Sequence, residues 1–397
     1  GKRVVLCDND TIGGTCVSYG CVPKKCWHYV SQFMHQHQLA MHHGFSGPNP
    51  QFDWALIQTK LASYIQSLNQ RHAAKCRDLG VDIVHGTATF TSPNTVVIND
   101  QAFTPKTICI STGARALRLP IPGAELADTS TEFFSWQALP NTVVLIGGGY
   151  IAVELASILN ALGADTHICI RSDQILRGFD ADIQQQLHQS LIKRGIHIHT
   201  NHHPTHIESS QTVSPNGTST NAVPLTIHFD GCPSISADKI IQAIGRAPNT
   251  DALNCDVAGI QRAHNGAIIV NDTYQTSNPD VVAFGDCIDQ QQLTPVAIAQ
   301  ARQWVDRFYS DRHFPFNPSL VPTAIFSHPE AASVGLTQAD AEQTTTITVK
   351  RLTFTPLAQA LQPDAHKEPI LMKVILDAAD NTVLGIHMVG EGAAEII

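Results

Sequence analysis

A strand, turn, helix and strand between residues 142 and 170 constrain the fold of this chain more than any other feature. The segment consists of the apolar run Thr142–Ile146, the turn Gly147-Gly148-Gly149-Tyr150-Ile151-Ala152, a helical stretch to Leu162, a turn at Gly163 and the strand Asp165–Ile170. A glycine pattern alone is weak, but this one lies inside a complete βαβ unit of about 30 residues. It predicts a parallel, Rossmann-like sheet whose glycine turn binds a nucleotide.

The end of the second strand indicates which nucleotide binds there. Arg171 follows this strand, and Arg177 comes six residues later. An acid at this place binds an unmodified ribose, whereas arginines pair with a 2′-phosphate through forked, charge-assisted hydrogen bonds. We therefore expect NADPH rather than NADH. The alternative is that both arginines are ordinary solvated residues.

A second nucleotide-binding fold is predicted at the start of the chain. Arg3–Leu6 is a short apolar run that ends in Cys7-Asp8, which is typical of a buried parallel strand finished by an acid. In nucleotide-binding α/β folds this acid accepts hydrogen bonds from a ribose, and Asp8 fits that place. No Gly-x-Gly-x-x-Gly turn precedes it, so we expect a fragment that lacks its first βα unit.

Two cysteines with four residues between them lie in the segment Gly13-Gly14-Thr15-Cys16-Val17-Ser18-Tyr19-Gly20-Cys21-Val22-Pro23-Lys24-Lys25. Nearby positive charge and a helix beginning around Cys16 both favour a thiolate. Residues five positions apart lie on different faces of a regular helix, so the first turn must be distorted, and Gly20 and Pro23 supply the irregularity. The segment predicts a dithiol that cycles between its reduced and oxidised forms.

Three other interpretations of these cysteines compete with a redox pair. A structural disulfide is disfavoured, because ten cysteines in 397 residues without a secretory leader suggest a reducing compartment. A zinc site made of Cys16, Cys21, Cys26 and His28 matches no common zinc spacing. Unpaired buried thiols are the third alternative.

Composition limits the remaining functions. A hydrophobic content of 43% over 397 residues allows two or three domains, and a net charge of −9 gives no support to nucleic-acid binding. No apolar stretch is long enough to span a bilayer, so we expect a cytoplasmic protein. Twenty histidines are scattered, the densest group being His197, His199, His202, His203 and His206. Because no carboxylates or cysteines fall at ligand spacing around them, we interpret them as surface residues and expect no metal.

The motif Gly-Gly-Thr-Cys-x4-Cys-Val-Pro-Lys-Lys resembles the redox centre of the flavin-dependent disulfide reductases, the class I pyridine nucleotide-disulfide oxidoreductase family, and Val-Pro-Lys-Lys in particular resembles its glutathione reductases. The resemblance spans the whole chain and suggests truncation at both ends. It implies an α/β fold with two Rossmann-like domains and a partial α+β dimerisation domain. The implied divisions are 1–118 and 252–316 for the FAD domain, 119–251 for the NADPH domain and 317–397 for the dimerisation domain.

The resemblance also implies functional residues. For FAD these are Asp8, Thr15, Cys16, Lys25, Ala88, Asp286 and Thr294. For NADPH they are Gly147, Gly148, Gly149, Tyr150, Ile151, Glu154, Arg171, Arg177 and Gly245. For the disulfide substrate they are Arg302 and His72, the latter at a position where the family has a tyrosine.

The implied reaction is reduction of glutathione disulfide by NADPH through FAD, in a homodimeric parent protein. Cys21 would lie nearest the flavin, Cys16 would open the substrate disulfide, and Lys25 would pair with Glu154 near the flavin ring. Ser18-Tyr19 stands where the family commonly has Asn-Val, which predicts a crowded loop. His328-Pro329 receives no role. Trypanothione-like disulfides remain an alternative substrate, and a non-catalytic NADPH-binding remnant is an alternative of another class.

Further elements are predicted along the chain. Helices are expected at 27–40, 52–79, 180–194 and from 293, and a polar hairpin at Glu208–Asp230. Strands are expected at 81–85, 87–90, 95–98, 107–110, 239–244, 281–284, 321–326, 346–353, 370–376 and 383–388. Ala331–Thr337, with Asp340-Ala341-Glu342, is interpreted as a connecting turn and helix.

Overall fold

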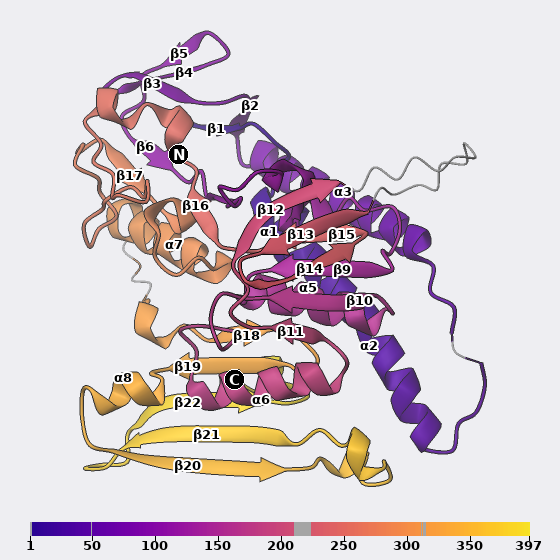
Figure 1. Ribbon diagram of the computed structural model, residues 1–397. Helices are drawn as coiled ribbons and strands as arrows, with labels where there is room; N and C mark the ends of the chain where they lie inside the picture. Colours follow the sequence, from indigo (N-terminus) through magenta and orange to yellow (C-terminus); the bar gives the residue numbers. More distant parts are fainter. Residues whose placement is uncertain (1, 49, 210–223, 311, 313–314) are drawn as a thin grey trace, which may run out of the picture. The chain divides into compact units, whose positions relative to one another are not determined.

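The computed structural model describes residues 2–48, 50–209, 224–310, 312 and 315–397 (Figure 1). The chain divides into two compact units, each made of three segments. Unit 1 contains residues 1–22, 62–117 and 246–318, and unit 2 contains residues 23–61, 118–245 and 319–397. Residues 210–223 of the predicted hairpin Glu208–Asp230 lie outside the described residues.

Unit 1 is built from small sheets, helix α7 (Thr294–Tyr309) and the C-terminal part of helix α3 (Trp54–Asp78). Its parallel pairs are β1 (Val4–Asp8) with β2 (Val81–His85), and β6 (Ile108–Ile110) with β17 (Val281–Ala283). Its antiparallel strands are β3 (Thr89–Ser92), β4 (Thr95–Ile98) and β5 (Gln101–Phe103) in one sheet, and β7 (Ala114–Ala116) with β16 (Arg246–Pro248). Helix α7 begins where the sequence predicts it.

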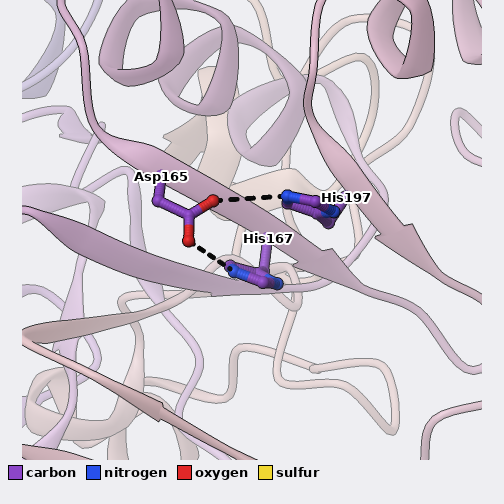
Figure 2. Close-up of side chains that lie close together, drawn as sticks. All are labelled: Asp165, His167 and His197. Carbon is purple, nitrogen blue, oxygen red and sulfur yellow. Dashed lines mark hydrogen bonds and ion pairs between the residues drawn. The ribbon is translucent and has the colours of Figure 1, made fainter.

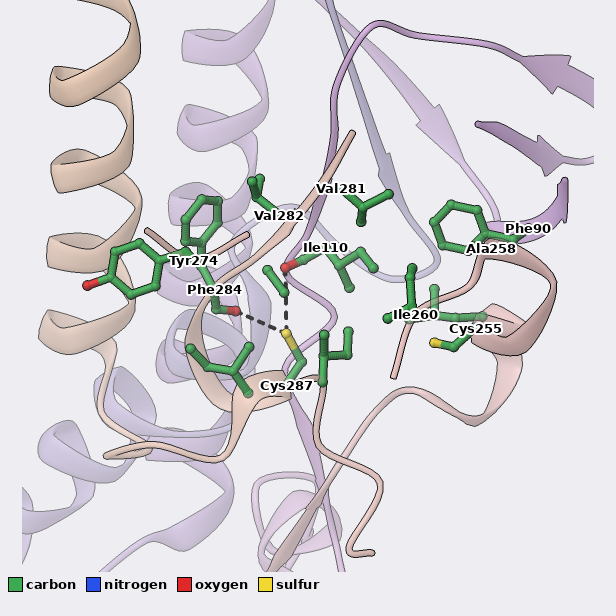
Figure 3. Packing of buried hydrophobic residues seen from close by; sticks show 14 of the residues in the cluster. Phe90, Ile110, Cys255, Ala258, Ile260, Tyr274, Val281, Val282, Phe284 and Cys287 are labelled. Carbon is green, nitrogen blue, oxygen red and sulfur yellow. Dashed lines mark hydrogen bonds between the residues drawn. The ribbon is translucent and has the colours of Figure 1, made fainter. Parts of the chain in front are cut away.

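The core of unit 1 gathers around β6 and β17 (Figure 3). Phe90, Ile110 and Val281 are buried there, and so is Cys287. The Cys287 thiol donates to the carbonyl oxygens of Phe284 at 3.1 Å and Ile110 at 3.5 Å, and burial raises its pKa to about 11. This cysteine is therefore a packed core residue that stays protonated at neutral pH.

The prediction that the first strand is buried is wrong for its first half. Val4 is 45% exposed and Val5 is 39% exposed. Within the described residues β1 has a single neighbouring strand, β2, so one edge of β1 carries no strand. The parallel pairing and the position of Asp8 at the strand end are as predicted.

Unit 2 contains a five-stranded parallel sheet in the order β11, β10, β9, β15, β8. The predicted βαβ unit is confirmed as β9 (Thr142–Ile146), α5 (Tyr150–Ala161) and β10 (Asp165–Cys169). The other strands are β11 (His197–His199), β15 (Lys239–Gln242) and β8 (Asp128–Thr129). An antiparallel sheet of β12 (Pro204–Ser209), β13 (Leu225–Phe229) and β14 (Cys232–Ala237) shares a core cluster with it.

The C-terminal part of unit 2 is an antiparallel sheet in the order β18, β19, β22, β21, β20. Its strands are β18 (Thr323–Ile325), β19 (Ala331–Gly335), β20 (Ile347–Phe354), β21 (Ile370–Asp377) and β22 (Val383–Val389). The prediction of a turn and helix at Ala331–Thr337 is wrong over Ala331–Gly335, which is β19. This strand pairs on both sides, so its small residues are held by neighbours rather than by their own propensity.

The long helices agree with the sequence to within a few residues. They are α2 (Cys21–His42), α3 (Trp54–Asp78) and α6 (Ala181–Lys193). The short α1 (Gly14–Ser18), α4 (Ser130–Phe133), α8 (Gln338–Glu342) and α9 (Ala393–Ile396) complete the α-helices that the structure describes. Within the described residues, no helix is both long and apolar enough to cross a membrane.

Candidate active site

The cysteine segment is an interrupted helix, as the spacing predicts. Helix α1 ends at Ser18 and α2 begins at Cys21, so Tyr19 and Gly20 separate the two cysteines. A Cβ atom on Gly20 would lie 2.9 Å from the carbonyl oxygen of Thr15. A larger residue at position 20 would therefore push the two turns apart, and glycine is what allows Cys16 and Cys21 to face each other.

The thiols of Cys16 and Cys21 are hydrogen-bonding neighbours and both are half-buried. The hydrogen bond to Cys21 and then burial raise the pKa of Cys16 above its usual value, while a hydrogen bond with Thr294 acts in the opposite direction. Thr294, the first residue of α7, lies with its Oγ1 3.7 Å from Sγ of Cys21. In the dithiol form the hydrogen bond between the two sulfurs therefore opposes loss of the Cys16 proton, and the thiolate at Cys16 stays a prediction.

The loop around the cysteines is supported by hydrogen bonds rather than crowded. The buried Ser18 hydroxyl lies 3.1 Å from Oγ1 of Thr11 and accepts a hydrogen bond from Asn69 at 3.2 Å. The Tyr19 hydroxyl donates to Asp10 at 3.4 Å. Both residues that depart from the family pattern thus have polar partners, so the predicted crowding does not occur.

Glu154 of α5 pairs with Lys24, not with Lys25. Nζ of Lys24 lies 2.6 Å from Oε1 of Glu154, and the side chains are 14% and 4% exposed. Lys24 lies on the same face of α2 as the buried Trp27, His28 and Ser31, at helical spacings of three, four and seven residues. Lys25 is one residue, or about 100°, further round the helix and is exposed.

Phe326 completes this site, and sequence reasoning missed it. Its backbone N–H donates to Oε1 of Glu154 at 2.9 Å. Nζ of Lys24 lies 4.2 Å and Nζ of Lys25 4.4 Å from the centroid of its ring. The aromatic face stabilises both ammonium groups, and the residue follows directly after β18. Nothing local marks Phe326, since its partners lie about 170 and 300 residues away along the chain.

The carboxylates predicted to face FAD lie at the ends of strands in unit 1. Asp8 ends β1, and Asp286 follows β17 in the turn Gly285–Ile288. Burial raises the pKa of Asp286, Arg246 lowers it, and Asp289 raises it. No side-chain hydrogen bond to Asp286 occurs within the described residues. A half-buried carboxylate without a donor suits a ligand that brings hydroxyl groups, as the ribityl chain of FAD does.

The glycine turn after β9 fits a dinucleotide pyrophosphate. Gly147 has a φ of +119°, and a Cβ there would lie 2.3 Å from the carbonyl oxygen of Ala243. A Cβ on Gly148 would lie 2.9 Å from Cγ2 of Ile170, whereas a Cβ on Gly149 would meet no described atom within 4 Å. The backbone at Gly149 is therefore open to a ligand at the N-terminus of α5, where helix N–H groups favour an anion.

The other residues predicted to bind NADPH lie after β10, at the start of α5 and after β15. Arg171 and Arg177 are exposed, and neither forms an ion pair in the part of the chain that the structure describes. Two unpaired guanidinium groups after β10 fit a 2′-phosphate. Tyr150 and Ile151 form the first turn of α5, and Gly245 has a φ of +127°.

The two residues predicted to contact the substrate, Arg302 and His72, lie in unit 1. Ala88 and Thr15, which are predicted to contact FAD, lie in the same unit. Arg302 is exposed on α7, and His72 is exposed on α3. Ala88 is half-buried against the unit 1 core, and the backbone carbonyl of Thr15 accepts from Tyr19 at 2.8 Å. Their roles toward ligands stay predictions.

The histidines around residues 197–206 have acidic neighbours that the sequence did not predict. Asp165 and Glu208 lie within 3.4 Å of histidine nitrogens, so the expectation that no carboxylates stand at ligand distance is wrong. The alternative zinc set of Cys16, Cys21, Cys26 and His28 does not gather into a metal-binding group among the described residues. Nε2 of His28 instead lies 3.2 Å from Oε1 of Glu330 and 3.2 Å from Nε2 of Gln32.

Comparisons with known proteins match the whole chain. A family model described as pyridine nucleotide-disulphide oxidoreductase matches residues 1–301, and the dimerisation domain of the same group matches residues 321–397. Over its full length the chain is 34% identical to a glutathione reductase of Nostoc sp. and 36% identical to one of Schizosaccharomyces pombe, covering 87% and 86% of those proteins. The fold is similar to that of the HOCl-induced flavoprotein disulfide reductase RclA from Escherichia coli, with a TM-score of 0.85, 24% identity, and coverage of 100% of this chain and 86% of that one.

Proposed function

Because the chain belongs to the pyridine nucleotide-disulphide oxidoreductase family, we propose that Cys16 and Cys21 are the dithiol with which it reduces glutathione disulfide. Its activity is NADPH-dependent disulfide reduction, and its cofactors are FAD and NADPH. The predicted α/β fold with nucleotide-binding and dimerisation domains is confirmed. The observation that carries the proposal is the shared hydrogen bond between two half-buried thiols at a helix break.

The chain's own residues account for the thiol chemistry. When bound, FAD would supply the electron pair, drawn from NADPH, that together with two protons converts the Cys16–Cys21 disulfide into the dithiol. Cys16, after losing its proton, attacks one sulfur of the substrate disulfide, and the first substrate thiol leaves with a proton. Cys21 then attacks Cys16, which restores the protein disulfide and releases the second thiol.

Thr294 and Glu154 are assigned supporting roles. The Thr294 hydroxyl lowers the pKa of Cys16, in opposition to the hydrogen bond with Cys21, and so favours loss of the proton. Glu154 lies in the first turns of α5, directly after the glycine turn, and we assign it, held by Lys24, the place beside the nicotinamide. In this assignment Lys24 takes the place first given to Lys25.

The dithiol assignment is tested by single substitutions in the chain loaded with FAD. Cys16→Ser and Cys21→Ser are each expected to lower NADPH oxidation with glutathione disulfide by at least about 1,000-fold, since neither can close the cycle. Cys76→Ser, on α3, is the matched control and should retain full turnover. Activity in Cys16→Ser or Cys21→Ser within about tenfold of the parent protein would contradict the proposal.

The identity of the disulfide substrate is a separate proposal, and we propose glutathione disulfide. It rests on the relatives named glutathione reductase and on the exposed Arg302, whose guanidinium suits a substrate carboxylate. The measurement is kcat/KM for glutathione disulfide against trypanothione disulfide and lipoamide. We expect glutathione disulfide to be preferred by about tenfold or more, and Arg302→Ala to raise its KM. Preference for another disulfide by that margin would overturn the substrate while leaving the reaction class intact.

A further inference from the structure

Two histidines and an aspartate converge at the edge of the parallel sheet in unit 2. Asp165 and His167 lie two residues apart on β10, so their side chains share one face of the sheet. His197 on the neighbouring edge strand β11 is the direct register partner of His167. Figure 2 shows both imidazole rings turning a nitrogen toward the Asp165 carboxylate.

The distances within this group match those between the ligands of a small divalent cation. Nε2 of His167 lies 3.4 Å from Oδ2 of Asp165, and Nε2 of His197 lies 3.3 Å from Oδ1. Ligands placed 2.0–2.1 Å from a tetrahedral zinc ion are separated by about 3.4 Å. The three ligand atoms lie within 4.8 Å of one another, which leaves room for an ion among them.

The ring of His167 is held by a further histidine behind it. Nδ1 of His167 lies 3.0 Å from Nε2 of His199, two residues along β11 from His197. When the proton of His167 is on Nδ1 it donates to His199, and the Nε2 lone pair then points toward Asp165. Metal-binding histidines are usually fixed in this manner by a hydrogen bond on their second nitrogen.

The surroundings suit a cation that exchanges with solvent. Asp165 and His197 are exposed and His167 is half-buried, so an ion can enter without opening the fold. The rings of His167 and His197 stack with centroids 4.6 Å apart. Two neutral imidazoles and one carboxylate are ligands that Zn²⁺ prefers, and they leave a fourth position for water.

A second group of similar residues lies on the neighbouring antiparallel sheet. His206 and His228 are cross-strand partners with stacked rings, and Nε2 of His228 lies 3.0 Å from Oε1 of Glu208. In this group, among the described side chains, a single imidazole pairs with the carboxylate, whereas both imidazoles do so at Asp165. The first group is therefore the better-formed site.

We propose that Asp165, His167 and His197 bind a divalent transition-metal cation, with Zn²⁺ as the best fit, at the β10–β11 edge. The proposed site shares no residue with the dithiol. His199 is a positioning residue that orients His167. The competing interpretation is that the same contacts are ordinary hydrogen bonds between surface side chains.

The test is Zn²⁺ titration of the FAD-loaded, oxidised chain after removal of metals with a chelator, with affinity measured by competition against a chromophoric zinc indicator. We expect one site whose affinity falls at least about tenfold in each of Asp165→Asn, His167→Gln and His197→Gln. His228→Gln is the matched control and should leave that affinity within twofold. All variants keep the ten cysteines, so thiol binding contributes equally to each.

A second measurement covers the case in which a substitution disturbs folding. X-ray absorption at the zinc edge of the parent chain should report two histidine nitrogens and one carboxylate oxygen in the coordination sphere. A sphere dominated by sulfur would overturn the proposal. Equal affinity in the parent chain and His167→Gln would overturn it too, as would loss of binding in His228→Gln alone.

Discussion

Glu154 of α5 is a buried acid, and its hydrogen bonds come from two particular residues. It accepts hydrogen bonds from Nζ of Lys24 and from the backbone of Phe326. Lys25 also lies against Phe326 but makes no ion pair within the described residues. Neighbouring lysines in one motif therefore contribute very differently to stability.

Substitution of the two lysines should separate these contributions. Lys24→Ala leaves the Glu154 carboxylate buried without its counter-charge, and we expect the free energy of unfolding to fall by about 3 kcal/mol. Lys25→Ala, the matched control, should cost less than about 1 kcal/mol because its ammonium is exposed. Urea denaturation of each variant measures the difference, and equal losses would contradict the ion-pair assignment. Adding Glu154→Gln to Lys24→Ala should restore part of the loss.

We propose that Arg171 and Arg177 carry the choice between the two nicotinamide dinucleotides. A charge-assisted hydrogen bond contributes about 1.5–3 kcal/mol, so Arg171→Ser should raise KM for NADPH by roughly 10-fold to 100-fold. KM for NADH, which lacks the 2′-phosphate, should change by less than about threefold. Steady-state kinetics with both dinucleotides provide the measurement, and a parallel rise in both KM values would assign the arginine a structural role.

Among the elements, the start of α6 shows how charge joins parts of unit 2. Asp180 caps this helix by accepting from the backbone of Asp182, and it also accepts from the backbone of Gln338 on α8. Nζ of Lys373, on β21, lies 2.7 Å from Oδ1 of Asp180. Both side chains are almost fully buried. One carboxylate thus links two helices and a strand.

This carboxylate should make stability depend on acid pH. Burial would raise the pKa of Asp180, but the hydrogen bond from Lys373 and its other partners outweigh burial and hold the pKa below its ordinary value of 3.8. A depressed pKa in the folded state means that the stabilisation is present above about pH 4 and is lost as the pH falls through the folded-state pKa. Asp180→Asn should therefore lower stability by about 2 kcal/mol at pH 7 and flatten the acid limb of the stability curve.

The measurement is thermal unfolding between about pH 2 and about pH 7, a range that extends about two units below and about three units above an ordinary carboxyl pKa. Asp78→Asn, at the exposed end of α3, is the control. Its stability should fall at low pH as that of the parent chain does. An unchanged limb in Asp180→Asn would show that other carboxylates set the acid dependence.

Element positions were predictable wherever pattern and turn residues agree. The strands Val81–His85, Thr95–Ile98 and Thr142–Ile146 have the predicted bounds, because each is a short apolar run between turn residues. Ala331–Gly335 was missed because Ala-Ala-Ser-Val-Gly has little β propensity, and pairing with β18 and β22 decides its structure.

For the site, the sequence identified residue types better than partners. The cysteine pair and the glycine turn were found from local spacing, and Glu154 was found from the family resemblance. Whether Lys24 or Lys25 pairs with Glu154 depends on which face of α2 is turned toward α5. The approach of Asp165 to His197 depends on the register in which β10 pairs with β11. Both are contacts between segments distant in sequence, which local patterns do not encode.

At the scale of the whole molecule, the match of residues 321–397 to a dimerisation domain leads us to expect a homodimer. Strand β20 lies at the edge of its sheet and carries exposed Leu352 and Phe354, followed by exposed Leu357 and Leu361. An exposed apolar edge of this kind is typical of an interface.

Sedimentation velocity at micromolar concentration tests this assembly. We expect the parent chain to sediment as a dimer. The double variant Leu352→Asp and Leu357→Asp should dissociate, because each of the two subunits would then place two carboxylates at the expected interface. Leu79→Asp, an exposed leucine in unit 1, is the control and should remain dimeric. A monomeric parent chain would contradict the prediction, as would a dimer that survives the double substitution.

If Glu154 meets the nicotinamide, as we propose, its hydrogen bond from the Phe326 amide predicts an observable effect of dinucleotide binding. The amide that Glu154 holds follows directly after β18, a strand of the sheet matched to the dimerisation domain. If an arriving nicotinamide draws the carboxylate away, that amide loses its acceptor and exchanges its hydrogen with solvent faster. Faster deuterium uptake at the peptide containing Phe326 would then report that the nicotinamide dinucleotide is bound.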